Sequence, residues 1–183
     1  DTMISTTHAD LRLRAIDRGI DTRVVHGVTV QSAASSLTGL QNYRFGKAVT
    51  LPFPYAHGDG DVPGSVIETI EANRDRGLHT LVYLDIKVGT GPHGPDPDHE
   101  EYMRASHAAE LLAEPLGDQL GVVVARAGAP DPIVAADRLS ALATRDFGDP
   151  LHAIVLPGDL HHVEAEALVG LADAPPALVT DAE

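Results

Sequence analysis

The sequence predicts an α/β fold with a largely parallel or mixed central sheet. Five short runs rich in Val, Ile and Leu alternate along the chain with stretches of helical periodicity. Such alternation is typical of α/β proteins. Each run is largely apolar instead of alternating between apolar and polar residues, which indicates a sheet that is covered on both faces.

The predicted elements follow one another in a regular order. The strands are expected at 22–27, 47–53, 79–85, 121–127 and 152–157. The helices are expected at 8–19, 65–77, 99–114, 131–146 and 159–172, with a Gly-, Pro- and Asp-rich surface loop at 88–100. Gly19 suits the position that follows a helix end, and Pro132 suits a first helical turn. Val66, Ile67 and Ile70 fall on one helical face.

Composition and charge narrow the class of protein. The 183 residues favour a single domain, although two small lobes are compatible with this length. The formal net charge is −14, from 27 acidic and 13 basic residues, and only Lys47 and Lys87 are lysines. A hydrated acidic surface of this kind indicates adaptation to high salt, and the alternative is an ordinary acidic cytosolic protein. Without a basic patch, direct nucleic-acid binding is not expected.

The sequence also limits cysteine chemistry and membrane insertion. It has no cysteine, which excludes disulfides, thiol catalysis and thiolate metal sites. It has no apolar run of about 18 residues that could span a membrane. Its first residues have no apolar core of the kind a signal peptide needs. A cytoplasmic protein is therefore expected.

The segment "DLHHVEAEAL" near the C-terminus raises the question of a metal site. His162 and Glu166 stand four residues apart on the predicted helix, but the H-E-x-x-H pattern of zinc proteases is absent. A structural role is favoured, with Asp159 as the N-cap and Glu164 near the positive end of the helix dipole. His161 and Glu164 are expected on the surface or flank of this helix.

Three strand ends point to one small-molecule cleft. Residues 127–129 form a small-residue turn after the fourth predicted strand, Asp85 and Lys87 end the third, and the polar segment 26–40 precedes a small-residue helix. Open α/β folds bind ligands at the carboxyl ends of strands. No dinucleotide or P-loop motif occurs. His152 opens the last predicted strand, where a structural and a functional role are both open.

Six motifs in order give a more specific indication. They are "TTHADLRLRA", "LTGLQNYRFGK", "RGLHTLVYLDIK", "ARAG", "DFGDPLH" and "PGDLHHVEAEALV". As a set they resemble the diphthine synthase family over essentially the whole chain, most closely its archaeal and haloarchaeal members. These are S-adenosylmethionine-dependent methyltransferases of the tetrapyrrole-methylase-like group, which act on a modified histidine of translation elongation factor 2. The resemblance implies two α/β lobes with the methyl donor between them.

The resemblance also implies how the chain is divided. Residues 1–27 are expected to be the end of the first lobe, 28–44 the linking helix and 45–183 the second lobe. The family loop reads G-D-P-M, whereas this sequence begins at its aspartate and has Thr2 where proline is usual. Most of the first lobe is then absent from this sequence, which leaves open whether the chain methylates alone.

A donor-binding set follows from the resemblance position by position. The implied residues are Asp1, Ile4, Thr29, Val30, Leu84, Ala127 and His152. The implied cofactor is S-adenosyl-L-methionine, with no metal and no assigned catalytic residue. The implied partners are elongation factor 2 as substrate and a second copy of the chain. The alternatives are a second-lobe remnant that only binds or dimerises, and a methylase of cobalamin precursors.

Overall fold

The computed structural model describes residues 5–57 and 61–180. The helices are α1 (Thr6–Asp17), α2 (Val30–Thr38), α3 (Gly64–Arg74), α4 (Ala105–Leu116), α5 (Leu139–Ala143) and α6 (His162–Ala172). The strands are β1 (Val49–Leu51), β2 (Thr80–Leu84), β3 (Ile86–Gly91), β4 (Gly94–Tyr102), β5 (Leu120–Ala125), β6 (Ile133–Arg138) and β7 (His152–Leu156). Short 3₁₀ helices are η1 (Asn42–Arg44), η2 (Pro54–His57) and η3 (Pro176–Leu178).

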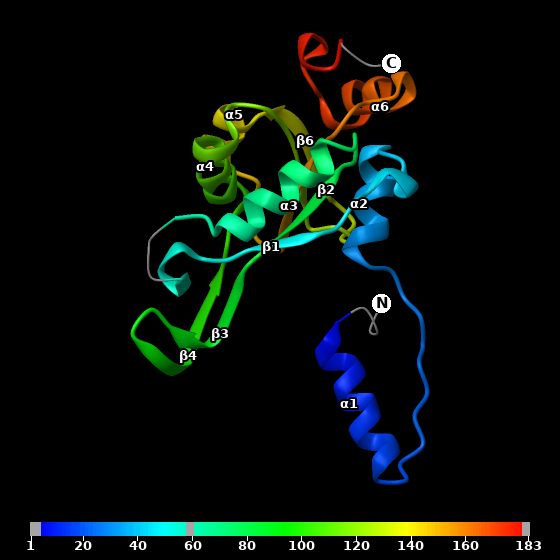
Figure 1. Ribbon diagram of the computed structural model, residues 1–183, viewed down its shortest axis with the longest axis vertical. Coiled ribbons are helices and arrows are strands. Elements are labelled where there is room, and N and C mark those ends of the chain that lie inside the picture. The colour runs from blue at the N-terminus through cyan, green and yellow to red at the C-terminus, as the bar shows by residue number, and fades with distance from the viewer. Residues whose placement is uncertain (1–4, 58–60, 181–183) are drawn as a thin grey trace.

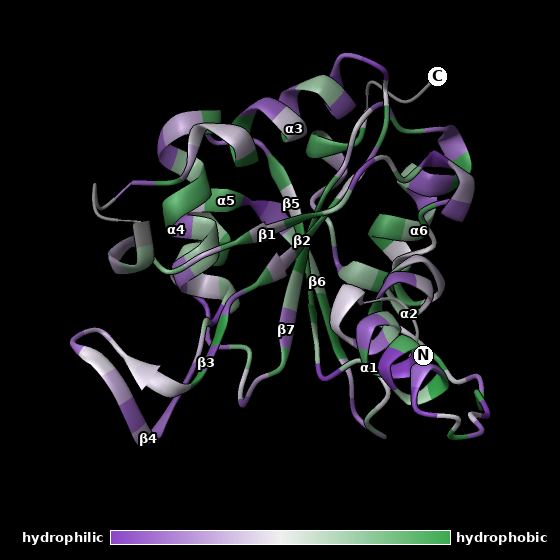
Figure 2. Ribbon diagram, turned by 60° about the horizontal axis from the view of Figure 1, so that its bottom comes forward, coloured by the Kyte–Doolittle hydropathy of each residue, from purple (hydrophilic) through white to green (hydrophobic). Residues whose placement is uncertain are grey.

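The described residues form a mixed sheet between two layers of helices (Figure 2). Its five strands lie in the order β1-β2-β7-β5-β6. β1 and β2 are parallel, whereas β7 runs antiparallel to both β2 and β5, and β6 runs antiparallel to β5. One apolar core lies between the sheet and α3, α4 and α5, and a second lies between the sheet and α2 and α6. The expectation of an α/β fold with a mixed, doubly covered sheet is confirmed.

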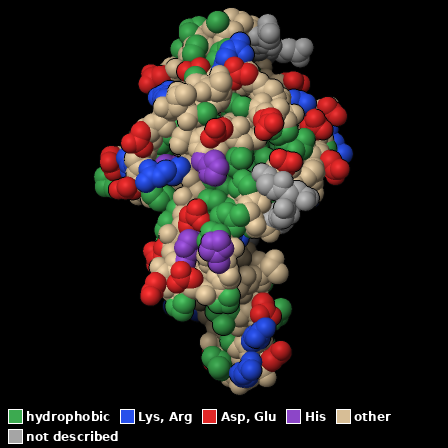
Figure 3. Space-filling model, turned by 90° about the vertical axis from the view of Figure 1, so that its left-hand side faces the viewer, with side chains coloured by type: hydrophobic (Ala, Val, Ile, Leu, Met, Phe, Trp, Pro, Cys, Tyr) green, Lys and Arg blue, Asp and Glu red, His purple; other side chains and the backbone are tan. Residues whose placement is uncertain are grey.

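Two elements lie outside this body (Figure 1). α1 is joined to α2 by an extended segment and has no buried residue. β3 and β4 form a separate two-stranded hairpin that projects beyond the end of β2. Among the described helices, none is long and apolar enough to cross a membrane. Acidic side chains are spread widely over the face drawn in Figure 3, with fewer Lys and Arg side chains between them.

Four of the predicted strands are confirmed, and the one at 22–27 is wrong. Residues 22–27 are not a strand in the structure, although their composition is strand-like. Val25 is 71% exposed. The apolar pattern predicted burial within a sheet, but the five-stranded sheet of the described chain starts only at β1. The composition of residues 22–27 therefore predicted a strand that the tertiary structure does not form.

Three further expectations are corrected in the second half of the chain. The predicted helix 131–146 is divided into β6 and the short α5, because residues 133–138 pair with β5 along its whole length. The predicted loop 88–100 belongs to the β3–β4 hairpin. The helix expected from residue 99 begins only at Ala105, since residues 99–102 are the end of β4. In each case backbone pairing with a neighbouring strand overrides local propensity.

Candidate functional site

A cavity of about 500 Å³ opens at one end of the main sheet. It is lined by the end of β2, the turn after β5, the start of β7 and the first residue of α2. Its lining is largely apolar, with Tyr83, Asp85, Tyr102, Arg126 and His152 as the residues that carry polar side-chain groups. A concave and mostly apolar site with a few polar groups is the usual form of a small-molecule site.

The cavity gathers four of the seven implied donor-binding residues. Val30, Leu84, Ala127 and His152 all line it, although they come from four separate segments of the chain. Thr29 adjoins the cavity through Val30 and is the N-cap of α2, where its hydroxyl accepts from the backbone N–H groups of residues 31 and 32 at 3.1 and 3.3 Å. Asp1 and Ile4 lie outside the described residues. Donor binding by this set stays a prediction.

His152 is the first residue of β7 and is held as a neutral ring. Its Nδ1 accepts from the backbone N–H of Ala105 at 3.1 Å, and its Nε2 lies 3.0 Å from the carbonyl oxygen of Asp149, to which it donates. Burial lowers the pKa of His152 below its usual range. A second proton on Nδ1 would also face the Ala105 N–H. His152 therefore forms a fixed wall of the cavity and is poorly suited to carry protons.

Asp85 and Lys87 differ in their relation to the cavity. Asp85 lines it, whereas Lys87 does not. The carboxylate of Asp85 accepts from the backbone N–H groups of Phe53 and Ile86 at 3.1 and 2.9 Å and pairs with Lys87 at 2.9 Å. Asp85 thus ties β2 to the chain after β1 and to the base of the hairpin.

Arg126 lines the cavity and is absent from the implied set. It occupies the left-handed region with a φ of 51°, which is unusual for a residue other than glycine. Gly128 follows with a φ of 93°, so the "ARAG" turn needs its glycine for conformation. In the sequence, Arg126 stands out only as an arginine among small residues, and its conformation and contacts become visible only in the structure.

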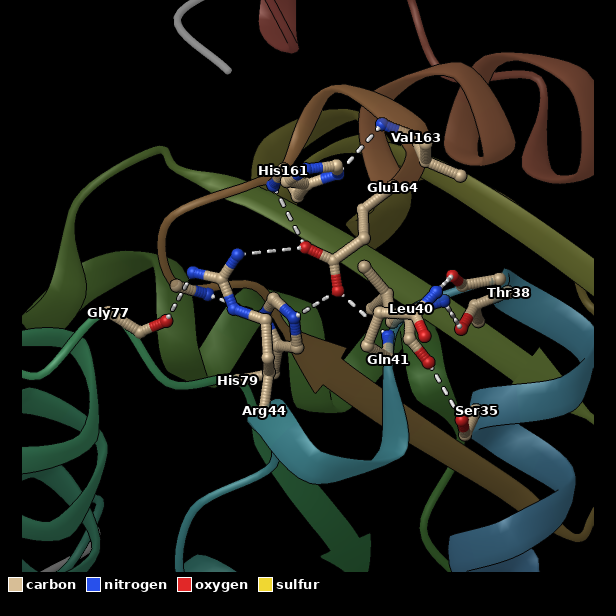
Figure 4. Close-up of polar contacts among 12 residues, drawn as sticks. Ser35, Thr38, Leu40, Gln41, Arg44, Gly77, His79, His161, Val163 and Glu164 are labelled. Carbon is tan, nitrogen blue, oxygen red and sulfur yellow. Dashed lines mark hydrogen bonds and ion pairs between the residues drawn. The ribbon is translucent and has the colours of Figure 1, made fainter. Parts of the chain in front are cut away.

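The C-terminal histidine-rich segment has a structural role that differs from the one expected (Figure 4). The N-cap of α6 is His161 and not Asp159, and Glu164 is fully buried instead of lying on the surface. Glu164 Oε1 accepts from the Gln41 N–H at 2.8 Å and from His79 Nε2 at 3.0 Å. Its Oε2 accepts from the His161 N–H at 2.9 Å and from Arg44 at 3.2 Å.

This buried cluster is remote from the cavity. His79 precedes the first residue of β2, whereas the cavity lies at the other end of that strand. Within residues 5–57 and 61–180, no group of three His, Asp or Glu residues is arranged to hold a metal ion. Every acceptor position of the Glu164 carboxylate is occupied by a protein donor, so the cluster joins α6 to η1 and β2.

Acid is expected to destabilise the fold through the two buried histidines. Burial lowers the pKa of His79 below its ordinary 6.5, and its Nδ1 accepts from the Gly158 N–H at 3.0 Å. Below about pH 6.5, His79 and His152 therefore bind protons more readily in the unfolded chain than in the native chain. The stabilisation from His79 and His152 is fully present above about pH 6.5 and is lost as the pH falls toward the lower native pKa.

Denaturant unfolding at pH 7.5 and pH 5.5 measures this effect. His79→Gln keeps a donor for Glu164 but removes one titrating group, so its unfolding free energy should fall less between the two pH values. An equal loss in wild type and variant would show that His79 is not responsible.

The chain is similar to known proteins in sequence and in structure. No model of a protein family matches the sequence. Diphthine synthase of Halorubrum lacusprofundi is 80% identical and that of Natronomonas pharaonis 72% identical, each over 99% of this chain and 68% of the relative. A crystal structure of diphthine synthase superposes with a TM-score of 0.82 at 37% identity, covering 99% of this chain and 66% of that one.

The mixed sheet, its two helical layers and the cavity at its strand ends define an α/β lobe of the tetrapyrrole-methylase-like kind. The chain belongs to the diphthine synthase family. It spans about two thirds of the length of these relatives. Both curated relatives come from halophilic archaea, in agreement with the acidic composition.

Proposed function

We propose that this chain is the second-lobe part of an S-adenosylmethionine-dependent methyltransferase that acts on the modified histidine of translation elongation factor 2. The observation that carries the proposal is the cavity in which Val30, Leu84, Ala127 and His152 converge. Family membership supports it. Residues 1–27 are assigned to the first lobe, 28–44 to the linking segment and 45–183 to the second lobe, with Asp1 and Ile4 completing the donor site.

The cavity suits the proposed donor in size and chemistry. Its volume of about 500 Å³ lies within the range of about 300–1,000 Å³ that is usual for small-molecule sites. Small residues at 127–129 allow a ligand to approach the backbone closely. S-adenosylmethionine supplies a methyl group on a sulfonium, and transfer requires a neutral amine in line with it. The residues of the cavity contribute position, which can account for much of the rate enhancement in such a displacement.

Calorimetry with S-adenosylmethionine and S-adenosylhomocysteine tests the proposal on the 183-residue chain. Saturable binding with one site per chain is expected, and binding should weaken in His152→Ala. Absence of binding together with dimer formation in light scattering would instead support the alternative of a lobe that only binds or dimerises.

The proposed enzyme is a cytoplasmic homodimer.

Substrate class is tested separately by transfer of labelled methyl. For the two-lobed enzyme, elongation factor 2 that carries the amino-carboxypropyl histidine is the expected acceptor and a precorrin is not. The 183-residue chain alone is expected to bind S-adenosylmethionine weakly and to transfer no methyl group. Labelling of the precorrin alone would favour the cobalamin-precursor alternative.

A further inference from the structure

One loop forms part of the cavity wall without belonging to the sheet. Residues 145–151 lie between the C-cap of α5 and β7; Pro150 and Leu151 in this loop, and His152 directly after it, line the cavity. Leu151 is 56% exposed, so packing alone does not hold it in place. Phe147, in the same loop, is buried and lies edge-on to the His152 ring, with 6.4 Å between the ring centroids.

Two arginines from separate elements donate hydrogen bonds to this loop. Arg104, the N-cap residue of α4, donates to the carbonyl oxygen of Gly148 at 2.9 Å. Arg126, in the turn after β5, donates to the carbonyl oxygen of the neighbouring residue Phe147 at 3.1 Å. The second terminal nitrogen of Arg126 donates to the carbonyl and carboxylate oxygens of Asp131 at 3.1 and 3.3 Å, which fixes the guanidinium itself.

The backbone conformations of Arg126 and Gly148 bring the arginine close to this loop. Arg126 adopts its left-handed conformation while its N–H donates to the carbonyl oxygen of Leu151 at 2.9 Å. Gly148 has a φ of 75°, and a Cβ at this position would lie only 2.6 Å from Arg126 Nη1. The positive φ favours glycine at this position, and the space where a side chain would begin is occupied by the Arg126 guanidinium. Backbone strain that is maintained beside a ligand site commonly serves the site.

Both arginines adjoin residues that the cavity depends on. Arg126 directly precedes Ala127, and Arg104 directly precedes Ala105, whose N–H donates to His152 Nδ1. We infer that Arg126 and Arg104 are positioning residues of the proposed donor cavity, because they fix the loop 145–151 and so set the places of Leu151 and His152. This inference rests on the proposed function for the identity of the ligand but not for the loop geometry.

The test measures two quantities, the affinity for S-adenosylmethionine and the nuclear magnetic resonance signals of the His152 ring. In the whole 183-residue chain, Arg126→Ala is expected to weaken S-adenosylmethionine binding by about 10- to 100-fold, since misplacement of a site by about 1 Å can have such an effect. The nitrogen resonances of the His152 ring should shift or broaden in the same variant. The pKa of His152 should rise, because Arg126 acts with Arg104 to oppose its protonation while Asp146 favours it.

Two variants serve as controls. Arg138→Ala removes an arginine that donates to the carbonyl oxygen of Asp118 at the far end of β6, so donor affinity and the His152 resonances should not change. Arg126→Lys keeps the charge but replaces the two guanidinium nitrogens that meet Phe147 and Asp131 with a single ammonium, so an intermediate loss of affinity is expected. This variant decides the question if Arg126→Ala fails to fold.

Each outcome is informative. Weaker binding with altered His152 resonances supports the inference. Weaker binding with unchanged resonances overturns it, because Arg126 would then contact the donor directly. A lower melting temperature with unchanged affinity also overturns it, because the arginines would then be structural only. If the wild type binds no S-adenosylmethionine, the proposed function fails, and the His152 resonances of the variants alone decide whether the loop is held as inferred.

Discussion

Replacing Glu164 by alanine is expected to lower the free energy of unfolding by about 3–5 kcal/mol. Glu164 is fully buried at the start of α6, and its two carboxylate oxygens accept four hydrogen bonds from Gln41, Arg44, His79 and His161. Removing this carboxylate is costly because four donors lose their acceptor, and His79, which is fully buried, cannot turn to water instead.

The hydrogen bonds explain why this carboxylate stays ionised in the core. Burial alone would raise the pKa of Glu164, but the N–H groups of Gln41 and His161 and the ring of His79 outweigh burial and lower it. Arg44, whose side chain is 24% exposed, adds a positive charge and also donates to the carbonyl oxygen of Gly77 at 3.3 Å. One carboxylate therefore joins α6, η1 and the start of β2.

Denaturant unfolding followed by circular dichroism measures the effect, and Glu166→Ala is its matched control. Glu166 is exposed on the same helix, so its replacement should change the free energy of unfolding by no more than about 0.5 kcal/mol. Glu164→Gln should fall between the two, because an amide offers one oxygen to donors that previously met two. A change of similar size at positions 164 and 166 would contradict a central role for the buried cluster.

The sequence predicted the main sheet well where burial alone determines the strand. The apolar runs of β1, β2, β5 and β7 lie in the sheet, and apolar composition is sufficient to identify such strands. β6 was missed because Pro132 and the helix-forming residues after it suggested a helix, whereas pairing with β5 decides its conformation. The β3–β4 hairpin was missed because Gly, Pro and Asp are poor strand formers, and only the partner strand shows that they pair.

The site was predictable only in part for a similar reason. Strand ends indicated a cleft near Asp85 and Ala127, and the structure places both residues at one cavity. The buried position of Glu164 could not be read from the helix alone, since its partners Gln41 and His79 lie 123 and 85 residues away. Arg126 was missed because its contacts depend on a turn conformation that has no single-residue signature.

Replacing Ala127 by tryptophan is expected to weaken S-adenosylmethionine binding at least about 100-fold, which corresponds to about 2.7 kcal/mol. Ala127 lines the cavity from a partly exposed turn, so an indole at this position can fill space that the donor requires without disturbing the sheet. The melting temperature should therefore change little. Ala177→Trp, on the exposed face of η3, is the control and should bind the donor as the wild type does.

The chain has no tryptophan of its own, so the introduced indole also reports its surroundings. An emission maximum shifted to shorter wavelength in Ala127→Trp, but not in Ala177→Trp, would show that the indole occupies the apolar cavity. Calorimetry on the same sample then gives the donor affinity. If the indole is buried and affinity is unchanged, the donor binds elsewhere and the cavity bounded by Leu84, Ala127 and His152 is not its site. If the indole is buried and affinity is lost, the donor and the side chain compete for one space, and that space lies at the end of the sheet opposite to the Glu164 cluster.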